Sequence, residues 1–208
     1  LNKNLYEKEL NFENKSKKLD LKTLDHFLNE NVFKIEKDLN NFVKNIFLII
    51  DYDAFFSVNI SLKKNNYGEI ITIQNLNYIL NEAKDQCSNT LDDKKIINIL
   101  IDKYLIDDQI FMNLPQNLKC DYFSLDINFI CLPLNYIKNL ENTVSKYQIS
   151  INRVISMKYL ENLFLNQNIN LNDMAKKVID GYNLNEVVLT SKKTAKKTFF
   201  EKFFHFFS

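Results

Sequence analysis

The stretch Lys95-Ile-Ile-Asn-Ile-Leu-Ile-Asp-Lys-Tyr-Leu-Ile-Asp-Asp-Gln-Ile110 decides how we interpret the fold. It is rich in Ile and Leu over the length of two short strands. The two adjacent aspartates, Asp107 and Asp108, interrupt it with short polar side chains that suit a tight turn. We therefore predict two strands joined as a hairpin at Asp107 and Asp108.

The chain on the N-terminal side of this hairpin mixes both periodicities. Apolar residues recur at three- and four-residue steps where a helix is expected, and they alternate or run continuously where a strand is expected. These patterns predict a helix over Asp20–Asn41, a buried strand over Ile46–Ile50, a half-buried strand over Ala54–Leu62, a turn at Asn65–Gly68, a short strand over Ile70–Ile73 and a helix over Gln74–Gln86.

The chain on the C-terminal side continues the mixture. We predict a strand over Leu125–Leu132 closed by Pro133, a helix over Tyr136–Val144, a strand over Ile149–Ile155, and a short helix over Leu171–Ile179 followed by Gly181 as its C′ residue. The central elements, from Ile70 to Ile155, form one compact unit in this prediction. The fold class is therefore α/β, or α+β.

Composition limits the possible partners. The 208 residues suit one domain or two small ones, and 27 Lys and Arg nearly balance 26 Asp and Glu. Arg153 is the only arginine, so we expect no nucleic-acid partner. No signal-peptide core and no apolar run of 18 residues occurs, so we expect neither export nor a membrane span. Because the first residue is Leu1, we expect a fragment or a trimmed chain.

Candidate sites for chemistry are few. Cys87, Cys120 and Cys131 are odd in number and lack CxxC spacing, which favours three buried, reduced thiols over zinc or a disulfide framework. With only Gly68 and Gly181, the chain has neither a P-loop nor a GxGxxG motif. The acidic pairs are expected at strand ends and turns, with a divalent metal as the alternative: Asp51 with Asp53, Asp92 with Asp93, and Asp107 with Asp108. We therefore expect no catalytic residue, no cofactor-binding residue, no metal ligand and no enzymatic activity.

The C-terminal segment has a different character. Helical spacing gathers five phenylalanines on one face, with a sixth beside them, and lysines precede them or lie on the other side. Such a helix is suited to lie at a lipid surface, with its rings at the headgroup boundary and its cations near anionic lipid. The alternative is a helix packed on the domain core or in a partner's groove. The predicted membrane-binding residues are Phe199, Phe200, Phe203, Phe204, Phe206, Phe207, Lys192, Lys193, Lys196, Lys197 and Lys202.

The middle of the chain resembles FtsA, the bacterial actin-like cell-division family. The resemblance is clearest in Ile96–Gln109, where an apolar strand leads to Tyr and then to Asp-Asp-Gln. Further matches are Phe47–Asp51 and Val58–Ser61, where the family has a strand pair, then Asn113-Leu-Pro115, Leu125–Ile130, Asn139-Leu140 and Ile151–Ile155. Ala175–Val188 is similar to the last helix of the actin-like body, and the Phe-rich helix is similar to the family's membrane-targeting sequence.

The resemblance implies four regions. They are a remnant of actin-like subdomain 1A (residues 1–69), a unit like subdomain 1C, or SHS2 domain (70–155), residual helices of the actin-like body (156–184), and a linker with the amphipathic membrane-targeting helix (185–208). Subdomain 1C is the family's surface for self-association and for contacts with later division proteins. The implied partners are therefore the inner-membrane lipid surface, other division proteins and a second copy of the chain.

The chain departs from the family at the nucleotide site. The Asp-x-Gly phosphate loops and the glycine-rich adenosine motif are absent, so ATP, the family's ligand, does not carry over, and we expect no cofactor. The subdomain that grips FtsZ is missing by similarity, which puts that contact in doubt. The resulting hypothesis is a truncated or internally deleted FtsA-like peripheral protein on the cytoplasmic face of the membrane, at the septum. Alternatives are a soluble interaction domain or non-functional fragment with its tail on its own core, and a residual ATPase.

Overall fold

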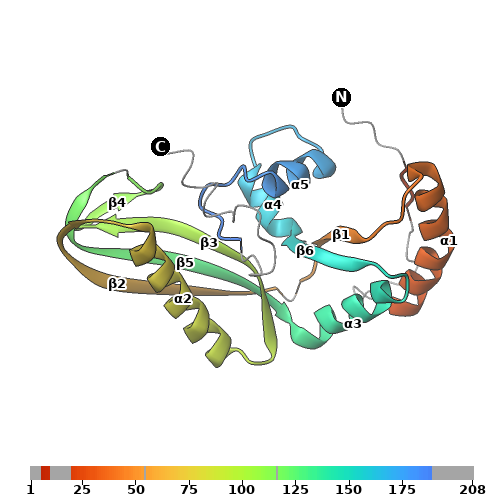
Figure 1. Ribbon diagram of the computed structural model, residues 1–208, viewed down its shortest axis with the longest axis horizontal. Helices are drawn as coiled ribbons and strands as arrows, with labels where there is room; N and C mark the ends of the chain where they lie inside the picture. The colour runs from red at the N-terminus through yellow and green to blue at the C-terminus, as the bar shows by residue number, and fades with distance from the viewer. Residues whose placement is uncertain (1–5, 10–19, 54, 116, 189–208) are drawn as a thin grey trace.

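The computed structural model of the protein describes residues 6–9, 20–53, 55–115 and 117–188. Within these ranges the chain forms five helices and two β-sheets, so the fold belongs to the mixed α/β class that the sequence predicts (Figure 1). In chain order the elements are α1 (Leu21–Leu39), β1 (Asn45–Ile50), β2 (Phe56–Ile70), α2 (Ile73–Thr90), β3 (Lys94–Ile106), β4 (Gln109–Phe111), β5 (Lys119–Pro133), α3 (Leu134–Ser145), β6 (Ser150–Ser156), α4 (Met157–Leu163) and α5 (Leu171–Ile179).

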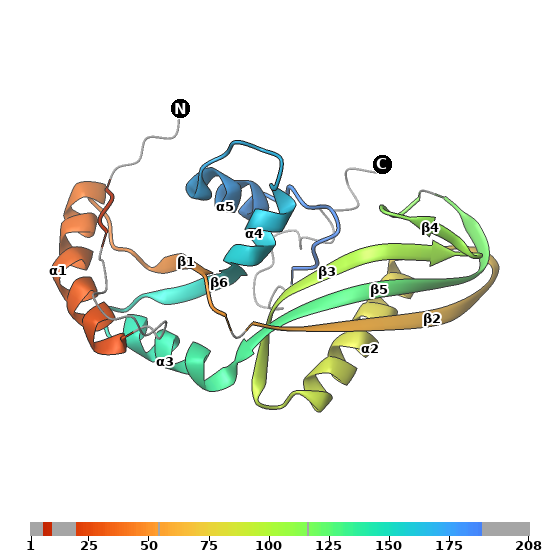
Figure 2. The same ribbon diagram turned by 180° about the vertical axis from the view of Figure 1, so that it is seen from behind.

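The larger sheet is antiparallel, with the strand order β2-β5-β3-β4, and α2 lies along one of its faces (Figures 1 and 2). Successive side chains of a strand point to opposite faces. On the face toward α2, the side chains Leu125, Ile127 and Phe129 of β5 are fully buried in the largest apolar cluster. Burial of each such side chain contributes about 1.5–3 kcal/mol, so this face holds most of the core.

The opposite face of this sheet is polar. Ser57 Oγ donates a hydrogen bond to Asn128 Oδ1 at 2.7 Å, and Ser61 Oγ donates to Asp126 Oδ1 at 2.6 Å, each across the β2–β5 pair. Lys103 of β3 completes an ion pair with Asp126 at 3.1 Å. These cross-strand pairs match a face turned to solvent.

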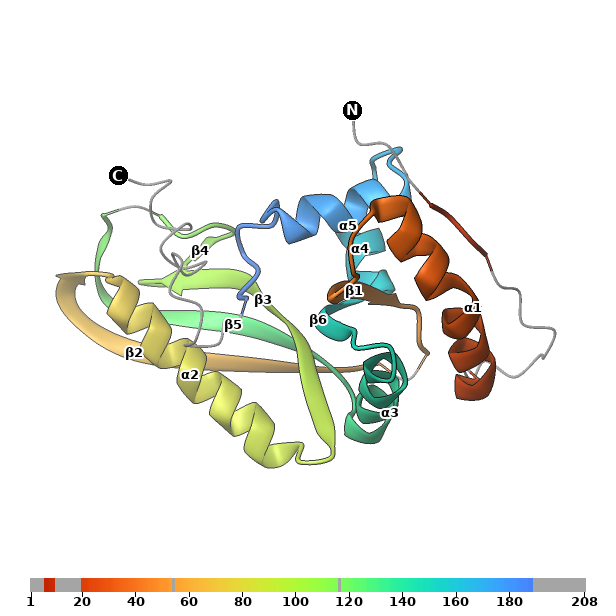
Figure 3. The ribbon, with the colours of Figure 1, turned by 45° about the vertical axis from the view of Figure 1, so that its right-hand side comes forward.

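The smaller sheet consists of β1 and β6, which run parallel. Figure 3 shows this pair between α3 on one side and α4 with α5 on the other, and α1 packs beside α3. Side chains of β1 pack on both sides of this sheet. Leu48 and Ile50 belong to the apolar cluster that contains residues of α3, and Ile49 belongs to the cluster that contains residues of α4 and α5. The antiparallel sheet is thus inserted between two strands of a layered parallel body.

Local sequence explains most helix ends. Asp20 caps α1, since its carboxylate accepts the Lys22 N–H at 3.0 Å. Thr72 and Asn75 form a reciprocal capping box at the start of α2. At the end of α5, Gly181 has a φ of +85°, and Tyr182 N–H donates to Lys177 O at 2.9 Å. Gly181 is therefore the C′ residue of a Schellman motif, as the sequence predicts.

The hairpin prediction at Asp107 and Asp108 is confirmed. Their φ values of +44° and +65° are those of a type I′ turn, and Ile106 pairs with Gln109 across it. Asp107 also accepts hydrogen bonds from the backbone N–H groups of Asp121 and Tyr122, at 3.0 and 3.1 Å. The turn is thereby fastened to the start of β5.

Two predictions about connections are wrong. Asn65–Gly68 is not a chain reversal, because β2 continues through it with a bulge between Asn65 and Glu69. Asn66 stabilises the bulge, since its side chain is buried and donates to Glu69 O. Residues 70–73 form no strand of their own: Ile70 ends β2 and Ile73 begins α2.

The sequence predicts one compact unit from Ile70 to Ile155, but the structure divides the strands of this range between two sheets. Strand β2 pairs with β5 between Phe56 and Ile70. Strand β6 pairs with β1 and is not part of the antiparallel sheet. The strands containing Phe47–Asp51 and Val58–Ser61 consequently lie in different sheets and do not pair with each other. The inserted unit spans residues 56–133, and the boundary expected between residues 69 and 70 falls within β2.

Candidate functional site at the base of the C-terminal segment

Residues 183–188 are the last described residues, and the backbone ties them to the body. Ile101 N–H donates to Asn185 O at 2.8 Å, and Val187 N–H donates to Ile99 O at 2.9 Å. Residues 185–187 therefore lie along β3, on the part of its edge that β4 leaves open (Figure 2). The segment that leads into the predicted membrane helix starts from a fixed point.

A buried carboxylate reinforces this attachment. Glu186 is only 4% exposed, and its carboxylate forms an ion pair with Arg153 of β6. Asn98 Nδ2 of β3 donates to Glu186 Oε1 at 3.1 Å, and the Tyr159 hydroxyl of α4 donates to Glu186 Oε2 at 3.1 Å. A buried charge is tolerated only when it is paired and hydrogen-bonded, and Glu186 meets both conditions.

The same network continues into both sheets. Asn98 Oδ1 accepts the Ser156 N–H at 3.2 Å, which links β3 to the end of β6. Asn183 Nδ2 donates to the Tyr159 hydroxyl oxygen at 3.0 Å. We refer to Asn98, Arg153, Tyr159, Asn183 and Glu186 as the Glu186 clamp. It joins the antiparallel sheet, the parallel body and the C-terminal segment at one point.

Within the clamp, the hydroxyl of Tyr159 keeps its proton near neutral pH. Burial and the neighbouring Glu186 carboxylate raise the pKa of Tyr159, so its hydroxyl remains a donor. Arg153 is permanently charged. The arrangement provides a charged, hydrogen-bonded joint. Its chemistry suits mechanical attachment.

The predicted membrane-binding residues follow this joint. Phe199, Phe200, Phe203, Phe204, Phe206, Phe207, Lys192, Lys193, Lys196, Lys197 and Lys202 all lie outside the described residues. Among the described helices, none is long and apolar enough to cross a bilayer.

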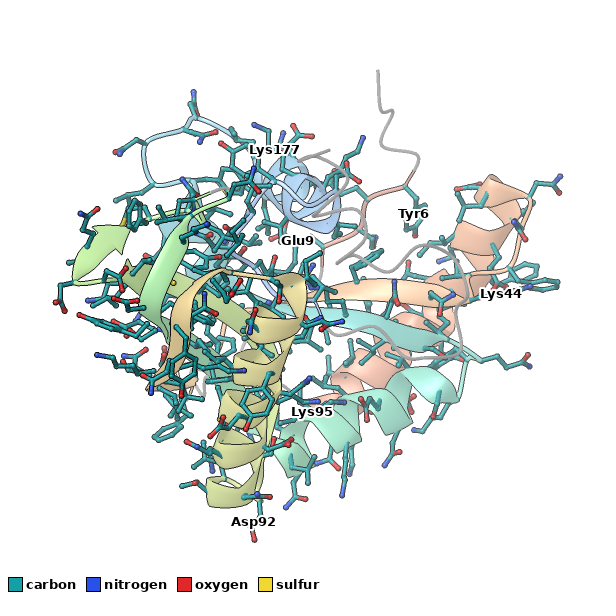
Figure 4. All side chains as sticks on the ribbon, turned by 60° about the vertical axis from the view of Figure 1, so that its left-hand side comes forward. Tyr6, Glu9, Lys44, Asp92, Lys95 and Lys177 are labelled. Carbon is teal, nitrogen blue, oxygen red and sulfur yellow. The ribbon has the colours of Figure 1, made fainter. Side chains whose placement is uncertain are left out.

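The acidic pairs lie at strand ends and turns, as expected, and Asp51 and Asp53 directly follow β1. Asp107 and Asp108 form the β3–β4 turn, and Asp93 pairs with Lys94 at the α2–β3 connection, where Asp92 projects from the tip (Figure 4). A hydrogen bond to Asp108, followed by burial, raises the pKa of Tyr122 to about 12. Within residues 6–9, 20–53, 55–115 and 117–188, no three His, Cys, Asp or Glu side chains gather as metal ligands would.

The three cysteines are free and buried, as predicted. Cys87 of α2 and Cys131 of β5 lie in the same apolar cluster. Burial, and then the neighbouring Cys87, raise the pKa of Cys131 to about 12. Thiols that are protonated and shielded from solvent react slowly, so these residues act as core side chains.

This pKa predicts a loss of stability in alkali. The unfolded thiol has a pKa of 9.0, so between pH 9.0 and about 12 the unfolded chain has released a proton that folded Cys131 keeps. The folded state then binds more protons, and rising pH lowers the free energy of unfolding. Urea titrations across this range measure the fall. Cys131→Ala is expected to weaken the pH dependence, and an unchanged slope in that variant would contradict the assignment.

A surface pocket lies beside exposed aromatic residues of α1 and of the connection between α1 and β1. It has a volume of about 410 Å³ and lies between the C-terminal half of α1 and the connections that lead into β1 and β6. Phe33 and Phe42 line it and are 73% and 75% exposed. It is a second place where an apolar group can bind.

Sequence reasoning did not find the Glu186 clamp. Arg153 offered a signal, because the only arginine of the chain sits in an apolar strand. Glu186 offered none, since it stands in a polar loop and its partners come from distant segments. Comparison with protein-family models and with curated proteins found no match for this sequence.

Proposed function

We propose that this chain is a non-enzymatic, peripheral membrane protein of the bacterial division machinery, similar to FtsA. In this proposal the C-terminal helix binds anionic lipid on the cytoplasmic face at the septum, and the antiparallel sheet binds other division proteins. The observation that carries it is the Phe-rich face of the sequence, which begins at Phe199, eleven residues after Val188.

The clamp supports an anchoring role. A tail that binds a membrane exerts force on the point where it leaves the body. That point is held by residues 185–187 and by the Glu186 ion pair. Removing one partner of a buried ion pair typically costs several kcal/mol, so the attachment resists local opening.

The lipid-binding energy is sufficient for reversible attachment. Full burial of one Phe side chain contributes roughly 1.5–3 kcal/mol, and an interfacial position about half of that. Each nearby lysine adds about 1 kcal/mol at an anionic surface. Part of this gain is offset by ordering the segment, because short helices are marginal in water.

The far end of the inserted sheet supports the protein-binding role. Tyr67 is 83% exposed and Tyr78 is 58% exposed, and Ile70 and Ile73 between them are each 41% exposed. Lys64 Nζ lies 4.2 Å from the centre of the Tyr78 ring. Exposed aromatic residues beside a cation are typical of protein interfaces.

Vesicle binding tests the anchor. We expect the protein to co-sediment with vesicles of phosphatidylglycerol and phosphatidylethanolamine, and Phe203→Glu with Phe204→Glu to reduce the bound fraction at least about tenfold. The matched control is Phe33→Glu with Phe42→Glu, which places the same charges on exposed phenylalanines of the body. Unchanged binding of the tail variant, or equal losses in both, would refute the anchor.

Cell imaging tests the division role separately. A fluorescent fusion expressed in a rod-shaped bacterium is expected to form a band at mid-cell, and the same fusion with the tail substitutions is expected to be diffuse. Uniform membrane labelling by the unaltered fusion would support lipid binding but refute the role at the septum.

The pocket favours one alternative function. Phe33 and Phe42 beside a cavity of about 410 Å³ are suited to receive the tail's own rings, which would give a soluble interaction domain. In that case Phe33→Glu with Phe42→Glu would release the tail and increase vesicle binding. The control pair in the vesicle assay therefore also tests this alternative.

A further inference from the structure

Strand β1 has an open edge. It pairs with β6 on one side, and among the described residues no strand lies on its other side. The outer backbone groups of a strand at such an edge are a template for another strand.

The side chains of β1 are those of an interior strand. Five of its six residues, Ile46 to Ile50, are apolar, and both faces of the strand are covered by helices. Continuous apolar runs are characteristic of parallel strands buried within a sheet, and sheets usually contain four to six strands. Nevertheless, Phe47 is 44% exposed. The composition of β1 fits a wider sheet than the two strands that this chain supplies.

Strand β2, at one edge of the larger sheet, is protected in the usual ways. It carries Lys63 and Lys64, and the bulge between Asn65 and Glu69 interrupts its pairing edge. Lysines and bulges discourage edge-to-edge association. β1 has no charged residue and no proline, and the extra residue at its irregular pairing with β6, Asn152, belongs to β6.

The charged residues of the edge strands indicate which partner can pair with the open edge of β1. If β2 paired with a second copy of itself about its middle residue, Lys63 would lie opposite Lys63, and like charges placed opposite each other are destabilising. If β1 paired in this way, only uncharged residues would face each other. A two-fold pairing of β1 with itself therefore brings no like charges together, and a two-fold axis is the commonest symmetry of protein dimers.

We propose that two copies of this chain associate through β1, antiparallel about a two-fold axis, and form a continuous sheet with the order β6-β1-β1-β6. The new pairing uses the outer backbone groups of β1 and reduces the exposure of Phe47. Lys44 lies directly before β1, at the end next to α1 (Figure 4), so its charge stays at the rim of the new sheet. This inference is independent of the membrane tail.

Light scattering after size exclusion tests the proposal on the full chain. Between about 1 and 100 μM, a range typical of weak specific association, the molar mass is expected to rise from 24.7 kDa toward twice that value. Phe47→Lys is expected to raise the dissociation constant at least about tenfold, because a charge next to the paired edge opposes association. The matched control is Phe56→Lys on β2, since both phenylalanines are 44% exposed; it is expected to leave the dimer intact.

Hydrogen exchange of the unaltered chain provides a second measurement that needs no variant. Protection of the β1 amides is expected to increase with protein concentration, while protection of the β2 amides stays constant. A mass that remains monomeric across the range would overturn the proposal. So would a dimer that Phe47→Lys leaves intact while circular dichroism shows it folded, or β1 protection that is independent of concentration.

Discussion

Arg153→Met is expected to lower the free energy of unfolding by about 3–5 kcal/mol, because it leaves the Glu186 carboxylate buried without its cation. Glu186 is 4% exposed, and the Arg153 side chain is 15% exposed, so water does not replace the lost partner. Guanidinium titration monitored by circular dichroism measures this change. The effect is large because desolvation of a lone charge exceeds the energy of the hydrogen bonds that remain to it.

Two further variants separate the ion pair from general loss of packing. Arg153→Met combined with Glu186→Leu removes both charges and is expected to recover most of the stability, since apolar replacement of a buried pair is often neutral or better. Lys103→Met disrupts the more exposed pair with Asp126 and is expected to cost at most about 1 kcal/mol. If the double variant is as unstable as the single one, the clamp does not act through charge.

Phe129→Ala is the second substitution with a large expected effect, a loss of about 3–5 kcal/mol. Phe129 is fully buried in the central strand β5, where it pairs with Val58 of β2 and Ile99 of β3. Its removal leaves a cavity between two strands and α2, a region that close packing prevents from collapsing completely. The same guanidinium titration measures the loss.

Phe56→Ala is the matched control for this substitution. Phe56 lies in β2 opposite Cys131 and is 44% exposed, so its truncation removes less buried surface and leaves no enclosed cavity. We expect a loss of about 1 kcal/mol or less. Equal losses at Phe56 and Phe129 would show that the largest apolar cluster is not the main source of stability.

Elements fixed by neighbouring residues were predictable from the sequence. The short helix Leu171–Ile179 and its Gly181 C′ residue match the structure, because helical spacing and a left-handed glycine are local signals. The hairpin at Asp107 and Asp108 was predictable for the same reason, since a two-residue turn depends on its own backbone angles.

Features that depend on distant residues were not predictable. The sequence around Gly68 resembles a turn, but the burial of Asn66 beside Cys120 of β5 makes it a bulge. The pairing of β1 with β6 joins strands separated by the whole inserted sheet, and no periodicity identifies such a partner. Glu186 is similar, because its role comes from three segments that meet only in the folded chain.

The route of the chain through the inserted sheet has an evolutionary consequence. The chain enters the sheet along β2 and leaves it along β5, and Phe56 and Cys131, near the two crossing points, are paired neighbours. The rings of Tyr52 and Tyr136, just outside the crossing, stack with centroids 4.6 Å apart. An inserted segment whose two ends lie close together can be gained, lost or exchanged in evolution, while the surrounding layers keep their order. Recombination can therefore replace the inserted sheet without rebuilding the layers around it.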